Sequence, residues 1–190
     1  TAERLHHADR VMMNGGGTSL PTTDERAVSA LTQVSRLTEV VTSTEPDAKG
    51  YNEEDIDLTK STTVVLAGSA NTGTLDVIAT TGNITQTGVL NVGGASSFTT
   101  SADDADITLT QANALTDSVT FTSTDTNSGN QEDIDLTNSI AVVLAGSTAT
   151  GTLDVIATTG NITQTGSLNV GGASSFTTST DGSNIILDHA

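Results

Sequence analysis

Two stretches of the chain are almost identical: GNITQTGVLNVGGASSFTTS at residues 82–101 and GNITQTGSLNVGGASSFTTS at residues 160–179. They differ only at Val89, which is replaced by Ser167 in the second stretch. An active site has no need of two copies, whereas a structure that grows by stacking equivalent units does. The repetition therefore predicts a fold built from structural repeats.

The repeat extends well beyond this stretch. Residues 54–101 align without a gap with residues 132–179, at an offset of 78, and 42 of the 48 positions are identical. The six differences are Lys60/Asn138, Thr62/Ile140, Thr63/Ala141, Ala70/Thr148, Asn71/Ala149 and Val89/Ser167. The same offset places residues 101–112 over residues 179–190. We therefore predict three parts: residues 1–53, a diverged repeat or cap; residues 54–131, a first solenoid repeat; and residues 132–190, a second, incomplete repeat.

Two interpretations of the N-terminal part remain open. LTQVSRLTEVVTST at residues 31–44 matches LTQANALTDSVTFT at residues 109–122 in the same register, which favours a diverged repeat. The alternative is a helix over residues 24–43 that caps the first turn of a stack, because apolar residues recur there at helical spacing. These residues are Ala27, Leu31, Val34, Leu37 and Val41.

Apolar and polar residues alternate in short segments that Gly, Asn, Asp and Ser separate, and this period of two predicts strands with one buried face. Aromatic residues make up only 2% of the chain, so the interior should be narrow and filled by aliphatic side chains. The side chains expected to point inward are Leu75, Val77 and Ala79; Leu90 and Val92; Phe98; Ile107 and Leu109; Val119 and Phe121; and Ile134 and Leu136.

Such strands could form a sandwich of hairpins or a solenoid. Tight hairpins favour Asn-Gly or Asp-Gly turns, and within residues 54–190 only Asp181-Gly182 provides one. In a solenoid each segment pairs with the segment one turn above, about 4.8 Å away, so that like residues stack in columns. We therefore predict an all-β, single-chain parallel β-helix (β-solenoid), with the possible N-terminal helical cap.

The repeat length also predicts how the turns are arranged. A repeat of this length would form three or four turns of roughly 20–26 residues each. The nearly identical stretch would then occupy the same turn in two stacked units. Asn83, Asn161 and the pairs Gly93-Gly94 and Gly171-Gly172 are expected at corners that need a left-handed or tight backbone.

Charge and composition narrow the partners and the location. Six basic and 23 acidic residues give a formal net charge of −17, which disfavours binding to nucleic acids and to anionic membranes. No apolar run approaches the length of a membrane span, so we expect no membrane insertion. The absence of cysteine is compatible with an extracellular bacterial protein. A chain that opens at Thr1 and stops within a repeat is expected to be a processed product or an excerpt.

No catalytic constellation is present, so we predict that the chain is not an enzyme. There is no cysteine nucleophile, GxSxG motif or phosphate-binding loop, and the histidines are only His6, His7 and His189, at opposite ends of the chain. The Asn-Ile-Thr sequences at Asn83 and Asn161 fit N-glycosylation acceptors, but corner asparagines are the simpler interpretation.

The motif EDIDLT, at residues 54–59 and again at residues 132–137, gathers most of the acidic side chains that could form a site. Outward carboxylates on stacked turns could bind Ca²⁺, the one cofactor that the pattern suits. However, the glycine-rich calcium nonapeptide is absent, and solvated acidic corners are the simpler interpretation. The calcium candidates are Glu54, Asp55, Asp57, Glu132, Asp133 and Asp135.

The phrases GNITQTG, LNVGGASSFT and ITLTQANALT resemble the β-strand repeats of filamentous haemagglutinin-type adhesins, which are bacterial exoproteins exported by two-partner secretion. The resemblance covers residues 54–190 and is poor over residues 1–53. It implies a right-handed parallel β-helix that forms an elongated shaft on the bacterial cell surface, with a role in attachment or in holding a distal domain. The implied partners are further repeats and a host or cell-surface receptor.

Other functions remain open at this stage. The chain could be a complete subunit that stacks end to end into an extracellular filament, because a solenoid end exposes strand edges. A trimeric phage-fibre β-helix would use similar short strands from three chains around one axis. A polysaccharide-degrading enzyme would need acidic and basic residues along one groove, and Lys60 is the only basic residue near the acidic motifs.

Overall fold

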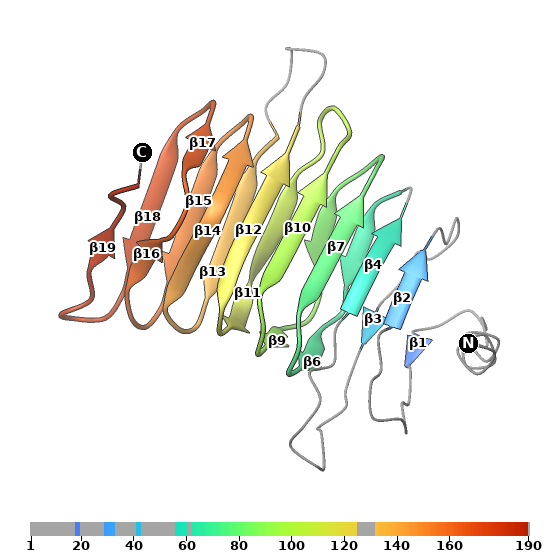
Figure 1. Ribbon diagram of the computed structural model, residues 1–190, viewed down its shortest axis with the longest axis horizontal. Helices are drawn as coiled ribbons and strands as arrows, with labels where there is room; N and C mark the ends of the chain where they lie inside the picture. The colour runs from blue at the N-terminus through green and yellow to red at the C-terminus, as the bar shows by residue number, and fades with distance from the viewer. Residues whose placement is uncertain are drawn as a thin grey trace.

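The computed structural model describes residues 18–19, 29–32, 41–42, 56–60, 62–124 and 132–189. Every regular element within these ranges is a β-strand, and the strands pair in parallel. Figure 1 shows the strands stacked one after another along the long axis, in chain order from the N-terminal to the C-terminal end. The predicted single-chain parallel β-solenoid is therefore confirmed.

Two facing sheets contain most of the strands, and the chain passes from one sheet to the other. Sheet one has nine strands: β2 (Ser29–Thr32), β4 (Ile56–Lys60), β7 (Leu75–Ala79), β10 (Ser96–Thr100), β12 (Ser118–Ser123), β14 (Val142–Ala149), β16 (Ile162–Gln164), β17 (Leu168–Val170) and β19 (Ile185–Ile186). Sheet two has eight: β5 (Val64–Leu66), β6 (Ser69–Asn71), β8 (Ile84–Gln86), β9 (Leu90–Val92), β11 (Ile107–Leu115), β13 (Ile134–Asn138), β15 (Leu153–Ala157) and β18 (Ser174–Thr178). A separate pair is formed by β1 (Thr18–Ser19) and β3 (Val41–Thr42).

The pairing register shows that the turns differ in length. From β4 to β19, sheet one advances by six steps, each of which is one turn of the solenoid. Ile56 pairs with Leu75 in a short turn, whereas Ile107 pairs with Ile134 in a longer one. Turns of unequal length can still stack because the loops between the strands absorb the difference.

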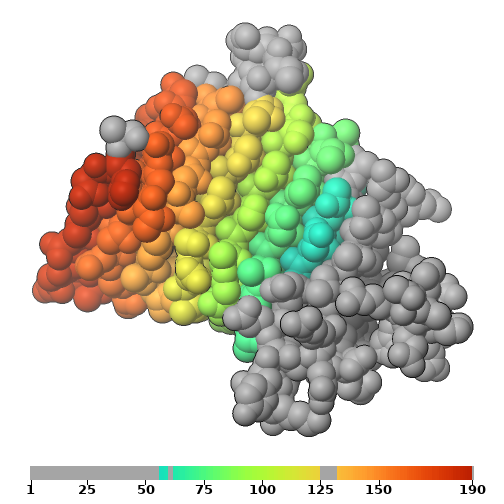
Figure 2. Space-filling model, viewed as in Figure 1, coloured from blue at the N-terminus to red at the C-terminus, as the bar shows by residue number. Residues whose placement is uncertain are grey.

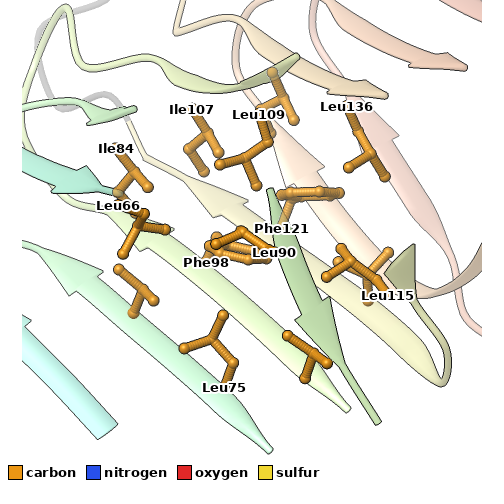
Figure 3. Packing of buried hydrophobic residues seen from close by; sticks show 14 of the residues in the cluster. Leu66, Leu75, Ile84, Leu90, Phe98, Ile107, Leu109, Leu115, Phe121 and Leu136 are labelled. Atoms are coloured by element: carbon orange, nitrogen blue, oxygen red, sulfur yellow. The ribbon is translucent and has the colours of Figure 1, made fainter. Parts of the chain in front are cut away.

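The interior is a single apolar core between the sheets. All the side chains predicted to point inward are buried, from Leu75, Val77 and Ala79 to Ile134 and Leu136. Figure 3 shows members of this core, among them Leu75, Phe98 and Leu136, meeting from both sheets. Phe98 and Phe121 stack in neighbouring turns, with ring centroids 5.7 Å apart and an interplanar angle of 20°. Burying the alternate residues of the inner strands is what stabilises a narrow core with few aromatics.

The repeat spans seven half-turns rather than a whole number of turns. Between β4 and its counterpart β13, the chain changes sheet seven times, through β5, β7, β8, β10, β11 and β12. Three and a half turns in a repeat of this length correspond to roughly 22 residues per turn, within the usual range for solenoids. Because seven is odd, each strand of the second copy lies on the sheet opposite to its counterpart.

This geometry corrects the expectation that the two copies occupy the same position in stacked units. β8 carries the first ITQ segment on sheet two, and β16 carries the second on sheet one. Likewise β10 and β18 carry the two SSFTT segments on opposite sheets. The corresponding residues of the two copies therefore do not stack on one another, because the average turn length does not divide the repeat length. Like residues of neighbouring turns do form columns, as predicted, and Ile84, Ile107 and Ile134 are one example.

The N-terminal strands follow the same offset as the two repeats. Thr18 pairs with Val41 as Ser96 pairs with Val119, and Ser29 pairs with Ile56 as Ile107 pairs with Ile134. This register supports the diverged first repeat. The helix expected over residues 24–43 is wrong at residues 29–32 and 41–42, which are strands. The other residues of that stretch lie outside the described residues.

The corner glycines are required for space rather than for a left-handed backbone. A Cβ atom on Gly93 would lie 2.7 Å from the Thr72 carbonyl oxygen, and one on Gly171 would lie 2.3 Å from the Thr150 carbonyl oxygen. Neither glycine pair has a positive φ. The left-handed alternative is therefore wrong, and the tight backbone predicted there is confirmed, because the preceding turn passes too close for any side chain.

Within the part of the chain that the structure describes, no helix is long and apolar enough to cross a membrane.

Candidate functional site

The two EDIDLT motifs do not form one acidic site. Asp57 lies on β4 in sheet one and is exposed, whereas its counterpart Asp135 lies on β13 in sheet two and is half-buried. The odd number of half-turns between the copies separates them. Glu54 and Asp55 lie outside the described residues, so the N-terminal motif can be judged only from Asp57.

Glu132 is buried, although the sequence suggested an outward carboxylate. Its exposed fraction is 0%, and its two carboxylate oxygens accept hydrogen bonds from the Asp104 N–H, at 3.1 Å, and from the Thr150 hydroxyl. Its backbone carbonyl accepts from the Gly151 N–H at 3.1 Å. A buried carboxylate is tolerated when donors satisfy its oxygens. Glu132 therefore joins the corners of neighbouring turns, and the expectation of an outward side chain is wrong.

Asp133 belongs to a series of side chains that connect successive turns at one corner. The Asp106 N–H donates to the Asn83 Oδ1 atom at 3.2 Å, and the Asp133 N–H donates to the Asp106 Oδ1 atom at 3.0 Å. The Asp133 Oδ1 atom in turn accepts from the Thr152 N–H at 2.8 Å. Each side-chain oxygen thus binds the backbone of the next turn, and we call residues 83, 106, 133 and 152 the corner ladder.

The second copy repeats the first step of this arrangement on the other side of the solenoid. The Asn184 N–H donates to the Asn161 Oδ1 atom at 2.8 Å, as the Asp106 N–H does to Asn83. Both asparagines directly precede an ITQ strand. Their predicted position at corners is therefore confirmed, and the hydrogen bonds explain why a short side chain with a carbonyl oxygen stands there.

Asp135 and Asp154 form an acidic pair on the outer face of sheet two. They are register partners on β13 and β15, where they alternate with buried residues. Burial raises the pKa of Asp135 above its ordinary value of 3.8, and the negative charges of Asp154, Asp133 and Asp106 raise it further. The Asp154 Oδ1 atom is buried and has no hydrogen-bond partner within the described residues. Neutralising one charge of this pair should therefore relieve repulsion.

Sequence reasoning missed Asp76 and Asp154 as members of this group. Asp57 pairs with Asp76 on sheet one, as Asp135 pairs with Asp154 on sheet two. The signal was available, because the segments IDL and LDV each carry an outward Asp and follow one another at close to the average turn length. The pairing register was needed to show that this spacing places the two Asp residues side by side on neighbouring strands.

In residues 56–60, 62–124 and 132–189, no group of three or more acidic, histidine or cysteine side chains is placed to hold a metal ion. His189 is exposed, and its backbone carbonyl accepts a hydrogen bond from the Gln164 side-chain amide at 3.1 Å. His6 and His7 lie outside the described residues.

Buried amide side chains are a second feature that sequence reasoning missed. Asn113, at a bend inside β11, has an exposed fraction of 0% and exchanges hydrogen bonds of 2.8 and 2.9 Å with Gln86. The Asn138 Oδ1 atom accepts from the Leu115 N–H at 2.9 Å. These amides satisfy backbone groups where the strands bend. The signal was faint: Asn138 stands where the first copy has Lys60.

A family model described as repeats of unknown function, DUF5649, matches residues 53–122 and residues 131–190. The chain belongs to this family. The two DUF5649 matches begin at the same position of each copy, so they follow the offset of the repeat of seven half-turns. No curated protein and no solved structure matches the chain significantly.

Proposed function

We propose that these DUF5649 repeats form a non-catalytic shaft segment of a bacterial cell-surface adhesin of the filamentous haemagglutinin type. The observation that carries the proposal is the repeat of seven half-turns. Every turn pairs with the next through its strands, and the corner ladder joins the turns from residue 83 to residue 152, so that each added repeat lengthens the same body. At about 4.8 Å per turn, three and a half turns add about 17 Å.

The charge of the solenoid body also supports this role. Residues 62–124 and 132–189 contain 11 acidic residues and neither lysine nor arginine. Such a surface stays soluble and does not adhere to anionic membranes or to nucleic acids. In this proposal the shaft stands outside the cell, its direct partners are further repeats, and a host or cell-surface receptor binds elsewhere on the adhesin. Ca²⁺ at the acidic corners is not required.

A second candidate is a subunit of a head-to-tail extracellular filament. The observation in its favour is the outer edge of β18, along which no described strand pairs. The phage-fibre alternative has less support, because strands of one chain already occupy the neighbouring positions that three interleaved chains would share.

Antibody labelling of the source bacterium tests the shaft proposal. An antibody raised against residues 62–124 should label intact cells, and a chromosomal deletion of one repeat unit should reduce adherence while surface labelling persists. An antibody against a cytoplasmic protein is the control and should label only permeabilised cells. Labelling by the repeat antibody only after permeabilisation, or adherence that is unchanged by the deletion, would contradict the proposal.

A further inference from the structure

The C-terminal end of the stack carries second copies of strands that are covered in the first copy. β18 is the last strand of sheet two and pairs with β15 on one edge only, among the strands that the structure describes. Its counterpart β10 lies between β7 and β12. Figure 2 shows the last turns, in red, at one end of the described body. The first copy therefore shows what covers such a strand.

The side chains at this end are less buried than their counterparts. Phe98 is fully buried against Phe121, whereas Phe176 is only partly buried. Ile107 has an exposed fraction of 0%, whereas its counterpart Ile185 has one of 44%.

The same loss of cover affects β17. Leu90 and Val92 on β9 have exposed fractions of 0% and 1%. The next turn covers them, because the Leu90 N–H donates to the Asn113 Oδ1 atom and Val92 pairs with Leu115. Their counterparts Leu168 and Val170 are only partly buried. Incomplete burial is thus found at residues whose counterparts lie beneath a following turn.

We propose that the outer edges of β18 and β19 form an interface for one further turn of the same repeat family. The incoming turn begins with a strand of the β12 pattern and continues with a strand of the β13 pattern. Earlier in the stack β12 covers β10 with Phe121 paired to Phe98, and β13 covers β11 with Ile134 paired to Ile107. The interface is continuous with the one that each turn already makes with the next.

The repeat of seven half-turns determines which sheet each strand of the incoming turn joins. Its β12-like strand joins sheet two, over β18, and its β13-like strand joins sheet one, over β19, which reverses the sheets of β12 and β13. A phenylalanine of the incoming strand then stacks on Phe176. This inference rests on the proposed function, because a shaft lengthens only at an edge of this kind.

An extended chain tests the inference. Residues 113–138 are appended after Ala190, because residues 179–190 are the counterparts of residues 101–112. Hydrogen exchange of the β18 amides, measured by mass spectrometry or NMR, should slow by at least about tenfold. The matched control carries L115D and F121D in the appended segment only, and β18 should exchange there as in the chain without an extension. Equal exchange in all three proteins would overturn the inference.

Sedimentation of the original chain, combined with hydrogen exchange at several protein concentrations, distinguishes a further turn from a second molecule as the occupant of this edge. We expect β18 to exchange at the same rate at all protein concentrations. Concentration-dependent association with protection of β18 would overturn the proposed occupant in favour of a second copy. Both measurements use purified protein, so their failure says nothing of cell-surface location, and failure of the antibody labelling says nothing of this edge.

Discussion

Strands β4, β7 and β10 pair in order on one side of the solenoid, and their counterparts in the second copy, β13, β15 and β18, pair in the same order on the opposite side. We call these two groups the first and the second strand ladder. Ile56 pairs with Leu75 and Leu75 with Ser96, as Ile134 pairs with Leu153 and Leu153 with Ser174. The first ladder belongs to sheet one and the second to sheet two. The local sequence thus determines which strands stack and which side chains point inward, and the number of half-turns determines the side.

The two ladders differ in what lies above them. β10 is covered by β12, and its residues Ser96, Phe98 and Thr100 are buried. β18 has no such cover within the described residues, and its residues Ser174 and Ser175 are exposed. An identical segment can therefore contribute differently to stability, because burial belongs to the stack rather than to the strand.

The largest effects should come from charges in the shared interior of the ladders. Val77 and Val155 are counterparts on opposite sheets, and each has an exposed fraction of 0%. V77D and V155D should each lower the free energy of unfolding by at least about 3 kcal/mol, because each buries an unpaired charge. Denaturant unfolding measures both, with the outward change D76N, which should have little effect, as the control. If either valine variant were harmless, the face assigned to its strand would be wrong.

Removing the matched phenylalanines should distinguish the covered ladder from the open one. F98A should cost about 3–5 kcal/mol of unfolding free energy, because Phe98 is buried and stacked on Phe121. F176A should cost less than half as much, because Phe176 is only partly buried. Denaturant titrations of the two variants give the difference directly. Equal losses would mean that the end of the stack is covered in solution.

A smaller effect is expected at a position where the copies differ. N138A should cost about 1–3 kcal/mol, because the Leu115 N–H loses its acceptor and the Ala141 carbonyl loses its donor. Asn169, an exposed asparagine on the outer face of β17, provides the control variant N169A. The measurement is the free energy of unfolding of N138A and of N169A. If both variants changed it by a similarly small amount, the buried amide of Asn138 would be dispensable for stability.

The smallest effect should depend on pH. Because the pKa of Asp135 is raised in the folded protein, the folded state binds more protons than the unfolded state between 3.8 and that raised pKa. The contribution of Asp135 to stability is therefore greatest below pH 3.8 and is lost as the pH rises through the folded pKa. D135N should be more stable than the original chain at neutral pH, and the difference should vanish in acid below the ordinary pKa of the carboxyl.

Chemical unfolding at the two pH values measures this difference, and added salt should reduce it at neutral pH because it screens the repulsion from Asp154, Asp133 and Asp106. D57N is the matched control on sheet one, where the exposed Asp57 should matter less. A D135N variant that is less stable at neutral pH than the original chain would show that the carboxylate is held by a partner.

Much of the fold could be predicted because a period of two reports directly on which side chains point inward. Val77, Leu90, Phe98 and Ile107 were all assigned correctly, since polar residues flank the segments that carry them. The repeat also predicted stacked parallel strands, although the strands that stack are neighbouring turns of similar pattern rather than the identical segments themselves.

Other features depended on distances that the sequence does not contain. The sheet to which each strand of the second copy belongs depends on whether the repeat spans an odd or an even number of half-turns. Because the turns differ in length, the repeat length alone is compatible with either number. From the sequence alone Glu132 is predicted to be an exposed charged residue. Its burial depends on two donors from neighbouring turns, the Asp104 N–H and the Thr150 hydroxyl. The acidic pairs likewise depend on the register between turns.

Two pairs of engineered cysteines test most directly whether the repeat spans seven half-turns. The chain has no cysteine of its own that could interfere. Thr108 and Asp135 are register partners on β11 and β13, whereas Thr120 lies on β12 in the other sheet. Neighbouring strands lie about 4.8 Å apart, within reach of a disulfide. We predict that T108C/D135C forms an intramolecular disulfide under mild oxidation and that T120C/D135C does not. The reverse result would place β13 on β12, make the repeat a whole number of turns and contradict the account.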